Sequence, residues 1–530
     1  MKISRRKFLS NTGAGVAGIS TLGHSGLGLA MSSTSVNDST DPGEFNYGVA
    51  SGDPRQDRVI LWTHFQPDVL LPVSVEWRVA LDAGMTDIAC SGTFHTDASR
   101  DYTVKVDADG LQPGTTYYYQ FNVQHKYSPV GRTRTAPEGD IAAARFAVIS
   151  CSSYAHGYFN VYRILSERDD LDAILHLGDY IYEYAQNDYD EILLRSKRAL
   201  APAHEIITLS DYRRRHALYK LDEDLQAVHR RHPFITVWDD HEFANDAYSG
   251  GAENHNDGEG DWEERKAAAK QAYFEWMPIR ENQDGTISRT LSYGSLLDLM
   301  MLDTRIEGRV VQPSGSDKQS EAKDSNRTLL GFEQEAWLHQ QLQTSTARWK
   351  VLGQQVMMAQ RYFINLPDYF GGGASLWLDS WDGYAASRDR LLALLRQQQI
   401  SNVVVLTGDV HSSFAADLSD DPYDNSNYNR NNGEGSLAVE FVTPSVTSPG
   451  FPPVIAETGA ATIMSASPHI KFAELRQHGF ILLSCTDTLV QADWYYVPQI
   501  LSRSADYYHA RSFRTLDGQN RLQNVDMPLI

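Results

Sequence analysis

Between about Asn46 and Thr135, apolar and polar residues alternate over short stretches separated by turn-forming residues. The stretches read RVILWTHF, VSVEWRVAL, YTVKVDADGL and TYYYQFNV, and they are rich in β-branched and aromatic residues. Alternation with a period of two places one face of a strand against a core and the other face toward solvent. The pattern therefore predicts a small all-β sandwich in this part of the chain.

A different pattern begins after the linker TAPEGDIAAA, which runs from Thr135 to Ala144. Short, continuous apolar runs such as RFAVISC and DAILHLGD now alternate with amphipathic stretches such as YFNVYRILSERDD. A strand, a helix and a second strand in this order form a βαβ unit, and the order recurs before FITVWDDH and NVVVLTGDVH. The second part is therefore predicted to be an α/β domain, with its active groups at the carboxyl ends of the strands.

Polar residues follow five of these apolar runs, at the points where the predicted strands end. They are Cys151, Asp179 with Tyr182, Asp239, Asp240 and His241 with Asn245, Gln354 with Gln355, and Asp409 with His411. Buried carboxylates are costly unless they are paired or bound to a cation, and the residues that directly follow these five runs include no Lys or Arg that could pair with them. A metal cluster is therefore expected where the strand ends meet.

The charge of the chain narrows the class of partner. The 530 residues carry a formal net charge of −21, whereas nucleic-acid binding needs a basic surface. No specific nucleic-acid partner is therefore expected. An acidic protein also repels an anionic substrate unless the site has its own positive charge, and bound metal ions would supply that charge.

Residues 1–30 have the features of an export signal. The basic MKISRRKFLS precedes a mildly apolar, Gly/Ala-rich stretch that ends near Ala30, and the pair Arg5-Arg6 resembles a twin-arginine signal. The alternative, a membrane anchor, is disfavoured because the stretch is short and rich in glycine. We therefore expect export through the Tat machinery to the periplasm, the extracellular space or the cell wall, without a stable membrane span.

The three cysteines are fewer than a disulfide-stabilised exported protein usually carries. At least one of them is unpaired because their number is odd. Cys90 and Cys485 are interpreted as core residues, and Cys151 at its strand end is interpreted as a metal ligand.

The ordered motifs resemble those of one enzyme family. Gly178–Tyr182 reads GDYIY, Asp239–Glu242 reads DDHE, and Gly408–His411 reads GDVH; this order is similar to the blocks of the metal-dependent, calcineurin-like phosphoesterases. The longer blocks CSS, LGDYIYE, VWDDHEFAND and TGDVHSS look like those of PhoD-type alkaline phosphatases, which are related to purple acid phosphatases. The β-sandwich before the α/β domain and the twin-arginine signal are similar too.

The resemblance implies a fold and an activity. It implies a metallophosphoesterase domain of the four-layer αββα sandwich type over residues 145–530, after an Ig/fibronectin-like β-sandwich at 45–137 and the signal peptide at 1–30. The implied activity is that of an exported alkaline phosphatase. It would hydrolyse phosphate monoesters and diesters and release inorganic phosphate through attack by a metal-bound hydroxide.

The resemblance also implies the residues of a first metal site. Asp179 would bridge two metals, and Tyr182 would supply a phenolate to ferric iron. Cys151 stands where the purple acid phosphatases have an aspartate, as it does in PhoD-type enzymes, and His411 would complete the site. A thiolate, a phenolate and an imidazole suit a transition metal on chemical grounds as well, so Fe³⁺ is expected here.

The second metal site is expected to consist of oxygen donors. The resemblance matches it to Asp240 and Asp409, where the wider superfamily usually has Asn and His. Asn245 is a further candidate as ligand and substrate-binding residue, although a capping role is also natural there. Only one of Gln354 and Gln355 can point inward along a strand, and Gln355 is preferred. Hard oxygen ligands suit Ca²⁺ or Mg²⁺; the resemblance favours Ca²⁺, and Mg²⁺, Mn²⁺ and Zn²⁺ are less expected.

His241 is the predicted catalytic side chain, next to the metal ligand and catalytic residue Asp240. It matches the superfamily position that binds the phosphate or protonates the leaving group. Asp239 and Glu242 are candidates for orienting His241.

Two other functions fit parts of the sequence. A phosphodiesterase or phospholipase D-like enzyme would use the same metals on phospholipid- or nucleotide-type diesters instead of small phosphate esters. The metal ligands do not distinguish the two activities, because rim loops such as GGGASLWLDSWDGY set the ester preference. A catalytically dead cell-surface binding protein is the alternative of another class. The intact set of site residues argues against it.

Overall fold

The structure is a computed structural model that describes residues 43–189, 198–315, 317–362 and 377–529. The predicted export signal at 1–30 and part of the predicted pocket rim, residues 371–376, lie outside the described residues. Among the residues that are described, no helix combines the length and the apolar character that a membrane span requires.

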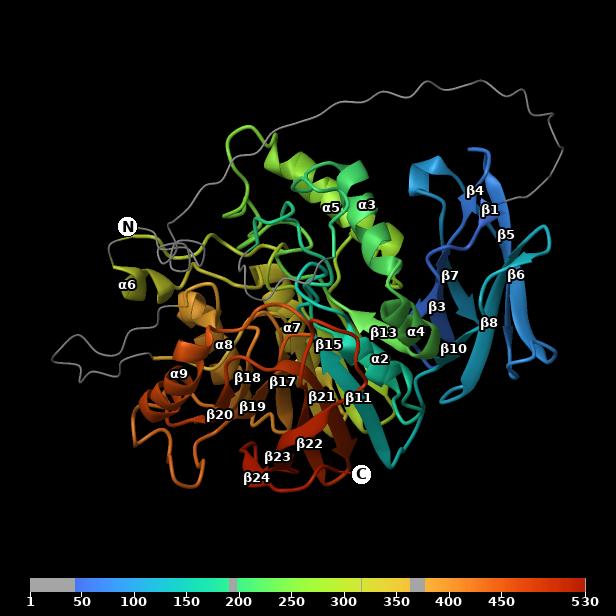
Figure 1. Ribbon diagram of the computed structural model, residues 1–530. Coiled ribbons are helices and arrows are strands. Elements are labelled where there is room, and N and C mark those ends of the chain that lie inside the picture. The colour runs from blue at the N-terminus through green and yellow to red at the C-terminus, as the bar shows by residue number, and fades with distance from the viewer. Residues whose placement is uncertain (1–42, 190–197, 316, 363–376, 530) are drawn as a thin grey trace, which may run out of the picture.

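Two large β-sheets form the centre of the molecule (Figure 1). The first has the order β24-β23-β22-β21-β11-β12-β13-β2-β3-β7, and the second has the order β14-β15-β16-β17-β19-β18-β20. The strands of the first sheet are β2 (Val49–Gly52), β3 (Arg58–His64), β7 (Thr103–Asp109), β11 (Ala143–Ile149), β12 (Ala173–His176), β13 (Pro233–Thr236), β21 (His478–Thr486), β22 (Leu489–Val497), β23 (Tyr508–Leu516) and β24 (Gln523–Val525). Those of the second are β14 (Arg289–Tyr293), β15 (Leu297–Met301), β16 (Trp349–Gln354), β17 (Val403–Thr407), β18 (Ser413–Leu418), β19 (Ala438–Val442) and β20 (Ile470–Glu474).

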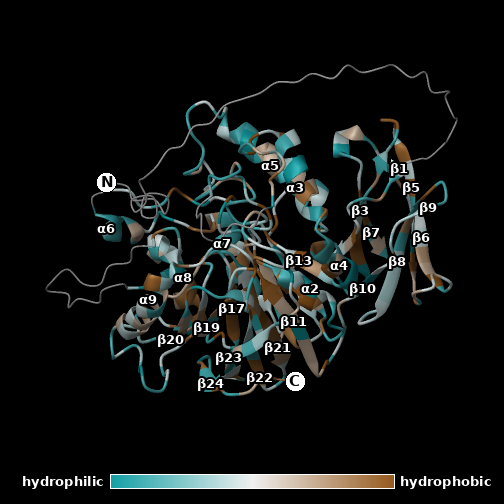
Figure 2. Cartoon of the chain, viewed as in Figure 1, coloured by the Kyte–Doolittle hydropathy of each residue, from teal (hydrophilic) through white to brown (hydrophobic). Residues whose placement is uncertain are grey.

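The two sheets pack face to face, which explains the continuous apolar sequence of their central strands. Every residue of β12 and β17 is buried, and Figure 2 shows hydrophobic residues concentrated along the central strands. Between the sheets, the ring of Phe146 lies 4.9 Å from that of Tyr293, and Phe441 lies 5.7 Å from Trp494. Strands β11, β12 and β13 are parallel, as are β15, β16, β17 and β19.

Helices cover the outer faces of both sheets (Figure 1). Beside the first sheet lie α2 (Asn160–Ser166), α3 (Leu209–Lys220), α4 (Glu223–Arg231) and α5 (Trp262–Trp276); beside the second lie α7 (Phe332–Thr344), α8 (Ala385–Gln397) and α9 (Pro453–Ala466), with the short α6 (Lys318–Ala322) nearby. Leu338 of α7 and Leu391 of α8 share a core cluster with Val405 of β17. The predicted α/β arrangement of this part of the chain is confirmed.

The N-terminal region is a two-layered β-structure, as the alternating pattern predicts. A sheet with the order β10-β8-β5-β6, with β9 beside β8, packs around a common core with β2, β3 and β7. The strands of this sheet are β5 (Val73–Ala80), β6 (Ile88–Thr96), β8 (Thr116–Val123), β9 (Lys126–Tyr127) and β10 (Gly131–Arg134), and β1 (Gly43–Glu44) pairs with β4 (Gln66–Pro67) beside them.

One layer of this N-terminal structure continues into the large sheet. The sequence predicted two separate domains and did not predict this continuation. Strand β2 pairs in parallel with β13, with Phe234 opposite Gly52. Strand β3 can lie in this shared sheet because both of its faces are buried: Leu61 packs in the N-terminal core, and Trp62 packs with Trp276 of α5. The expected boundary between 45–137 and 145–530 is therefore crossed by one continuous sheet.

Candidate active site

The predicted site residues converge at one edge of the two sheets, where the parallel strands end. Cys151 follows β11, Asp179 follows β12, Asp240 and His241 follow β13, and Asp409 and His411 follow β17. Ligands of α/β proteins bind at this edge because loops from several parallel strands meet there. The structure thus brings together residues that are more than 250 positions apart in the sequence.

Four of the predicted ligands have a backbone conformation that L-amino acids rarely adopt. The φ angles of Cys151, Asp179, Asp409 and His411 are 61°, 56°, 57° and 55°. Such a left-handed residue costs about 1–3 kcal/mol and persists where the surrounding structure imposes it. The turns after β11, β12 and β17 are therefore held in strained conformations at the site.

The glycines of the two GD motifs allow turns at neighbouring strand ends to touch. Gly178 has a φ of +100°, and a Cβ atom added to it would lie 2.4 Å from Cβ of Asp239. Gly408 of the second GD motif is similarly close, since its Cβ would lie 2.9 Å from Cβ of Ser150. Only glycine permits this approach without movement of the backbone, so the motif glycines bring the acidic residues together.

The residues of the predicted first metal site lie close together in the structure. Cys151, Asp179 and His411 each offer one ligand atom, and these atoms lie within 4.8 Å of one another. The hydroxyl of Tyr182 donates to Oδ2 of Asp179 at 2.9 Å and lies 3.2 Å from Nε2 of His411. Ser448, which follows β19, donates its hydroxyl to that of Tyr182 at 2.6 Å.

Hydrogen bonds and burial define the protonation of this group. Nδ1 of His411 lies 2.9 Å from the carbonyl oxygen of Pro449, so it carries the proton and leaves the Nε2 lone pair for a metal. Burial, and next the charge of Asp179, raise the pKa of the Cys151 thiol and of the Tyr182 phenol well above their usual ranges. Both groups therefore keep their protons unless a cation stabilises the anionic forms.

The second cluster consists of aspartates. Asp239, Asp240 and Asp409 lie within 4.8 Å of one another, as do Asp240, Asp246 and Asp379, measured between one carboxylate oxygen of each. Asp240 also forms such a group with Asp179 and His241. Asp240 thus connects the acidic cluster to Asp179 of the predicted first metal site.

Arg305 lies in the middle of this acidic cluster, and the sequence interpretation missed it. Its Nε donates to Asp239 at 2.5 Å, its Nη2 donates to Asp409 at 2.8 Å, and its Nη1 donates to Asp379 at 2.6 Å. Nη2 also lies 3.5 Å from Oδ1 of Asp240. The side chain is fully buried. Arg305 therefore neutralises part of a charge that the sequence interpretation assigned to metals alone.

A basic residue therefore does pair with the strand-end carboxylates, contrary to the expectation from the sequence. Arg305 follows β15, whose apolar run LLDLMML ends in Asp303, Thr304 and Arg305. Polar residues directly after an apolar run identified the other site residues, and the same criterion applies to this run. The sequence therefore contained the signal for Arg305. Arg309, one turn later, pairs with the other oxygen of Asp379 and donates to the hydroxyl of Tyr384 at 3.0 Å.

Glu183 orients His241. Nδ1 of His241 lies 2.7 Å from Oε2 of Glu183, and both side chains are buried. The other oxygen of Glu183 accepts from the backbone nitrogen of Asn245 and from Nδ2 of Asn254, both at 2.8 Å. Glu183 belongs to the block LGDYIYE that the sequence interpretation identified, but no role was assigned to it there.

The prediction that Asp239 or Glu242 orients His241 is wrong. Asp239 binds Arg305, and the carboxylate of Glu242 accepts three backbone N–H groups. These are the amides of Asp179 and Asp239 at 3.0 and 2.7 Å, and of Tyr180 at 2.5 Å. Glu242 therefore ties the turn after β12 to the turn after β13.

The charge of His241 follows from its neighbours. Burial lowers its pKa, but Asp240, Asp179 and Glu183 outweigh that effect, and the pKa lies well above its usual range. The imidazole is therefore protonated in the absence of metal ions, and Nε2 is the nitrogen that does not face Glu183.

The two predicted amide ligands have different positions. Asn245 is half-buried, and its Nδ2 donates to Glu253 at 3.2 Å. The oxygen of Gln355 accepts from both the backbone nitrogen and the hydroxyl of Thr304, and its nitrogen donates to the carbonyls of Trp238 and Leu302. These four hydrogen bonds use the amide oxygen that a metal ligand would need, so the prediction of Gln355 as a ligand is wrong. Gln355 instead holds the loops after β13 and β15 together.

The described residues fit a metal-bound state. Oδ1 of Asp179 and Oδ2 of Asp239 are buried without a hydrogen-bond partner among the residues that the structure describes, and buried carboxylate oxygens are stable when a cation lies against them. Burial raises the pKa of Asp239 well above its usual range, Arg305 opposes this, and Asp240 and Asp179 add to it. The sulfur, phenol, imidazole and carboxylate donors suit one transition metal and one hard cation.

Comparisons with known proteins show the family to which this chain belongs. Residues 146–494 match the family model described as PhoD-like phosphatase, and residues 30–137 match the model described as PhoD-like phosphatase, N-terminal domain. The chain is 37% identical over 555 residues to alkaline phosphatase D of Bacillus subtilis (strain 168). The alignment covers 99% of this chain and 90% of that relative. A solved structure described as "Structure of PhoD" superposes with a TM-score of 0.82 at 36% identity and covers 94% of both chains.

Proposed function

We propose a catalytic metal centre for this chain, which belongs to the PhoD-like phosphatase family. The centre is the cluster of predicted site residues that follow the parallel strands. The chain is a phosphatase and therefore an enzyme that hydrolyses phosphate esters. The observation that carries the proposal is the convergence of Cys151, Asp179 and His411 within 4.8 Å. Each of these residues adopts a strained left-handed backbone, which supports a common role.

Two metal positions follow from the donor types. Cys151, Tyr182 and His411 would hold Fe³⁺ together with Asp179, because thiolate, phenolate and imidazole ligands suit a transition metal. Asp240 and Asp409, with Asn245 at the rim, would hold Ca²⁺ through oxygen atoms. When bound, the two metals would supply positive charge to the phosphoryl oxygens and lower the pKa of a water molecule.

His241 would act on the substrate directly. Its charge is stabilised by Glu183 and Asp240, so it would bind a phosphoryl oxygen or donate a proton to the leaving oxygen. Glu183 fixes the ring, and Nε2 is the proton-bearing atom that would face the substrate. Arg305 would not touch the substrate, because its guanidinium is buried among aspartates; it would hold Asp239 and Asp409 in place.

We also propose an ester preference and a finer description of the fold. We expect phosphate monoesters and diesters to be substrates, whether small molecules or phospholipid- and nucleotide-type diesters. The two packed sheets with helices outside them support the four-layer αββα type, and the N-terminal two-layered structure supports an Ig-like domain. Rates with p-nitrophenyl phosphate and bis-p-nitrophenyl phosphate will separate a monoesterase from a phosphodiesterase.

The proposed export depends on residues 1–30, with their pair Arg5-Arg6. The twin-arginine type of signal requires both arginines. The double variant Arg5→Lys, Arg6→Lys should therefore retain the enzyme in the cytoplasm of a bacterial host, whereas the unaltered chain should appear outside it. Equal export of both would contradict the Tat assignment.

The metal centre is tested by elemental analysis together with visible absorption spectroscopy. We expect iron and calcium in the purified enzyme and a phenolate-to-iron charge-transfer band. Tyr182→Phe removes the phenol and should abolish the band, while Tyr180→Phe should retain it, because the hydroxyl of Tyr180 faces His229 at 2.9 Å, outside the metal cluster. A fully active enzyme that contains zinc and shows no band would refute the iron site.

A further inference from the structure

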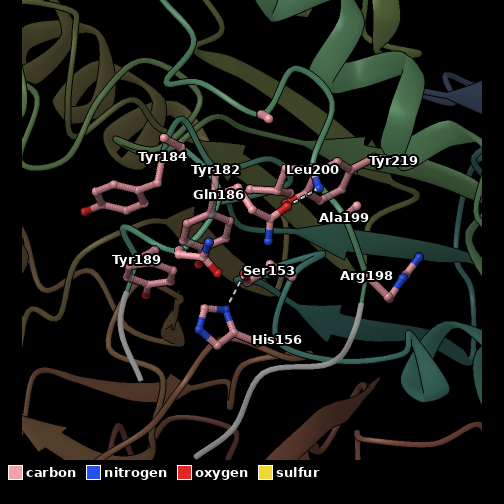
Figure 3. A pocket seen from close by; sticks show the side chains of 14 residues that line it. Ser153, His156, Tyr182, Tyr184, Gln186, Tyr189, Arg198, Ala199, Leu200 and Tyr219 are labelled. Carbon is pink, nitrogen blue, oxygen red and sulfur yellow. Dashed lines mark hydrogen bonds between the residues drawn. The ribbon is translucent and has the colours of Figure 1, made fainter. Parts of the chain in front are cut away.

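A cavity of about 510 Å³ lies beside Tyr182 (Figure 3). We propose that this cavity binds the alcohol portion of the phosphate ester and favours alcohols that carry a planar ring. The inference rests on the proposed function, because it places the scissile phosphate at the neighbouring metal centre. The volume lies within the range of small-molecule sites.

The cavity and the metal centre share a wall. The hydroxyl of Tyr182 bonds to Asp179 in the metal centre, whereas the side chain also lines the cavity. Ser153 lines the cavity as well, and its backbone nitrogen donates to Ser448, the residue that bonds to the Tyr182 hydroxyl. A phosphate at the metal centre would therefore have its ester group within reach of the cavity.

The walls of the cavity are mainly apolar and aromatic. Tyr184 and Tyr189 stack with ring centroids 4.7 Å apart and planes 5° apart, and Tyr189 lies 5.1 Å from Tyr182 at 23°. The ring of His241 lies 4.3 Å from that of Tyr182 and 5.3 Å from that of Tyr184. Figure 3 shows the three tyrosines on one side of the cavity. The residue proposed to protonate the leaving oxygen thus adjoins a surface on which a planar ring can stack.

The polar groups around the cavity suit a neutral ligand. Arg198 is paired with Asp222 at 2.5 Å, donates to the carbonyl of Gly157 and stacks on Tyr154 at 3.4 Å. Its charge is therefore already compensated. Arg198 is also the only Lys or Arg among the lining residues that the structure describes. A second phosphate group would find little compensation here, which favours a neutral alcohol over an anionic one.

Gln186 provides hydrogen bonding at a defined place. Its amide oxygen accepts from the backbone nitrogen of Leu200 at 2.6 Å, which orients the side chain (Figure 3). The NH₂ group of the same amide can then donate to a ring-borne oxygen or nitrogen. The class of alcohol that fits best is therefore a neutral aryl or heterocyclic alcohol, such as the sugar–base portion of a nucleotide.

The test compares two esters of matched reactivity. 2-Phenylethyl phosphate and propyl phosphate both release a primary alcohol, so a difference in kcat/KM reports binding of the ring. We expect the wild type to prefer the phenylethyl ester by about fivefold or more, the size of one aromatic contact. Tyr184→Leu should reduce this ratio toward one, and Tyr184→Phe should retain it. Tyr127→Leu, which removes a half-exposed tyrosine on β9, is the matched control and should retain the ratio.

A binding measurement covers the case in which Tyr184→Leu does not fold. 2-Phenylethylphosphonate should raise the melting temperature of the wild type more than propylphosphonate does, and Gln186→Ala should leave this order intact for these two ligands because neither carries a ring-borne polar atom. Equal kcat/KM for the two esters, or equal thermal shifts, would overturn the cavity proposal and leave the phosphatase assignment intact. Failure of the metal-loaded wild type to hydrolyse any ester, p-nitrophenyl phosphate included, would instead overturn the proposed function.

Discussion

Nε of Arg305 lies 2.5 Å from Oδ1 of Asp239, and both side chains are fully buried. Arg305 follows β15 of the second sheet and Asp239 follows β13 of the first, so the pair joins the two sheets across the site. A buried charge that loses its partner destabilises a protein strongly, by about 3–5 kcal/mol. The pair therefore holds the sheet edges together and sets the charge of the acidic cluster.

Arg305→Gln should destabilise the metal-free enzyme by about 3 kcal/mol or more, because Asp239 and Asp409 lose a buried cation. The variant should also gain more stability from added Ca²⁺ than the wild type does, since a bound cation replaces part of the lost charge. Denaturant unfolding with and without Ca²⁺ measures both effects. Arg213→Gln, which removes a partly exposed arginine from α3 and leaves the metal cluster intact, should show no larger gain from Ca²⁺ than the wild type, and the same result for Arg305→Gln would refute the argument.

Glu183→Gln should shift the alkaline limb of the pH–rate profile to lower pH. Glu183 raises the pKa of His241, although burial opposes it, and glutamine keeps the shape of the side chain but removes the charge. His241 would then lose its proton at a lower pH and would cease to act as the acid. We expect kcat to fall about tenfold on the alkaline side, with a smaller loss at acidic pH.

Glu253→Gln is the control for this prediction, because Glu253 contacts Asn245 at the rim and forms no hydrogen bond or ion pair with His241 among the described residues. Its profile should match that of the wild type. A uniform loss of kcat at every pH in Glu183→Gln, without movement of the limb, would show that Glu183 has only a structural role.

Gly178→Ala should abolish most of the activity and cost at least about 3 kcal/mol of stability. The added Cβ would lie 2.4 Å from Cβ of Asp239, and the φ of +100° is unfavourable for alanine. Gly258→Ala is a close control: its φ is +98°, but nothing lies within 4 Å of the added Cβ. It should cost only the backbone strain, about 1 kcal/mol or slightly more, with activity unchanged. Similar losses in both variants would mean that the contact with Asp239 is unimportant.

Asp417 should make the stability of the enzyme fall as the pH rises. Its carboxylate is buried in β18, accepting from Tyr428 and from the backbone nitrogen of Leu522, each at 2.7 Å. Burial raises its pKa from 3.8 to about 6. Between these values the folded state binds more protons than the unfolded state, so the free energy of unfolding decreases with rising pH by at most about 3 kcal/mol.

Asp417→Asn removes this titration. The difference in unfolding free energy between variant and wild type should therefore grow in favour of the variant from about pH 4 to pH 6 and then stay constant. Gln398→Asn alters an exposed side chain that has no titratable group and should give a difference that does not change with pH. Urea unfolding at each pH measures it, and a pH-independent difference for Asp417→Asn would refute the assignment.

The sequence by itself determined which strand ends meet at the site and most of the residues that lie there. Continuous apolar runs such as AILH and VVVLT specify strands that are buried on both faces, and the residue after each run must lie at the edge of a sheet. Because parallel strands end at the same edge, Cys151, Asp179 and His411 could be assigned to one place before any coordinates were known. The alternation of the N-terminal strands determined the two-layered structure in the same way.

The tertiary structure alone decided how the site residues pair. Whether Glu183 or Glu242 faces His241, and whether Gln355 points to a metal or to Thr304, depends on loop paths and side-chain directions that no periodicity encodes. The pairing of Arg305 with Asp239 also required the two sheets to be placed against each other. So did the continuation of the N-terminal layer into the large sheet, because contacts between strands distant in sequence arise from packing of the complete core. The local sequence pattern determines at the end of which strand a residue lies. The side chain with which it pairs is determined by burial and charge in the folded chain.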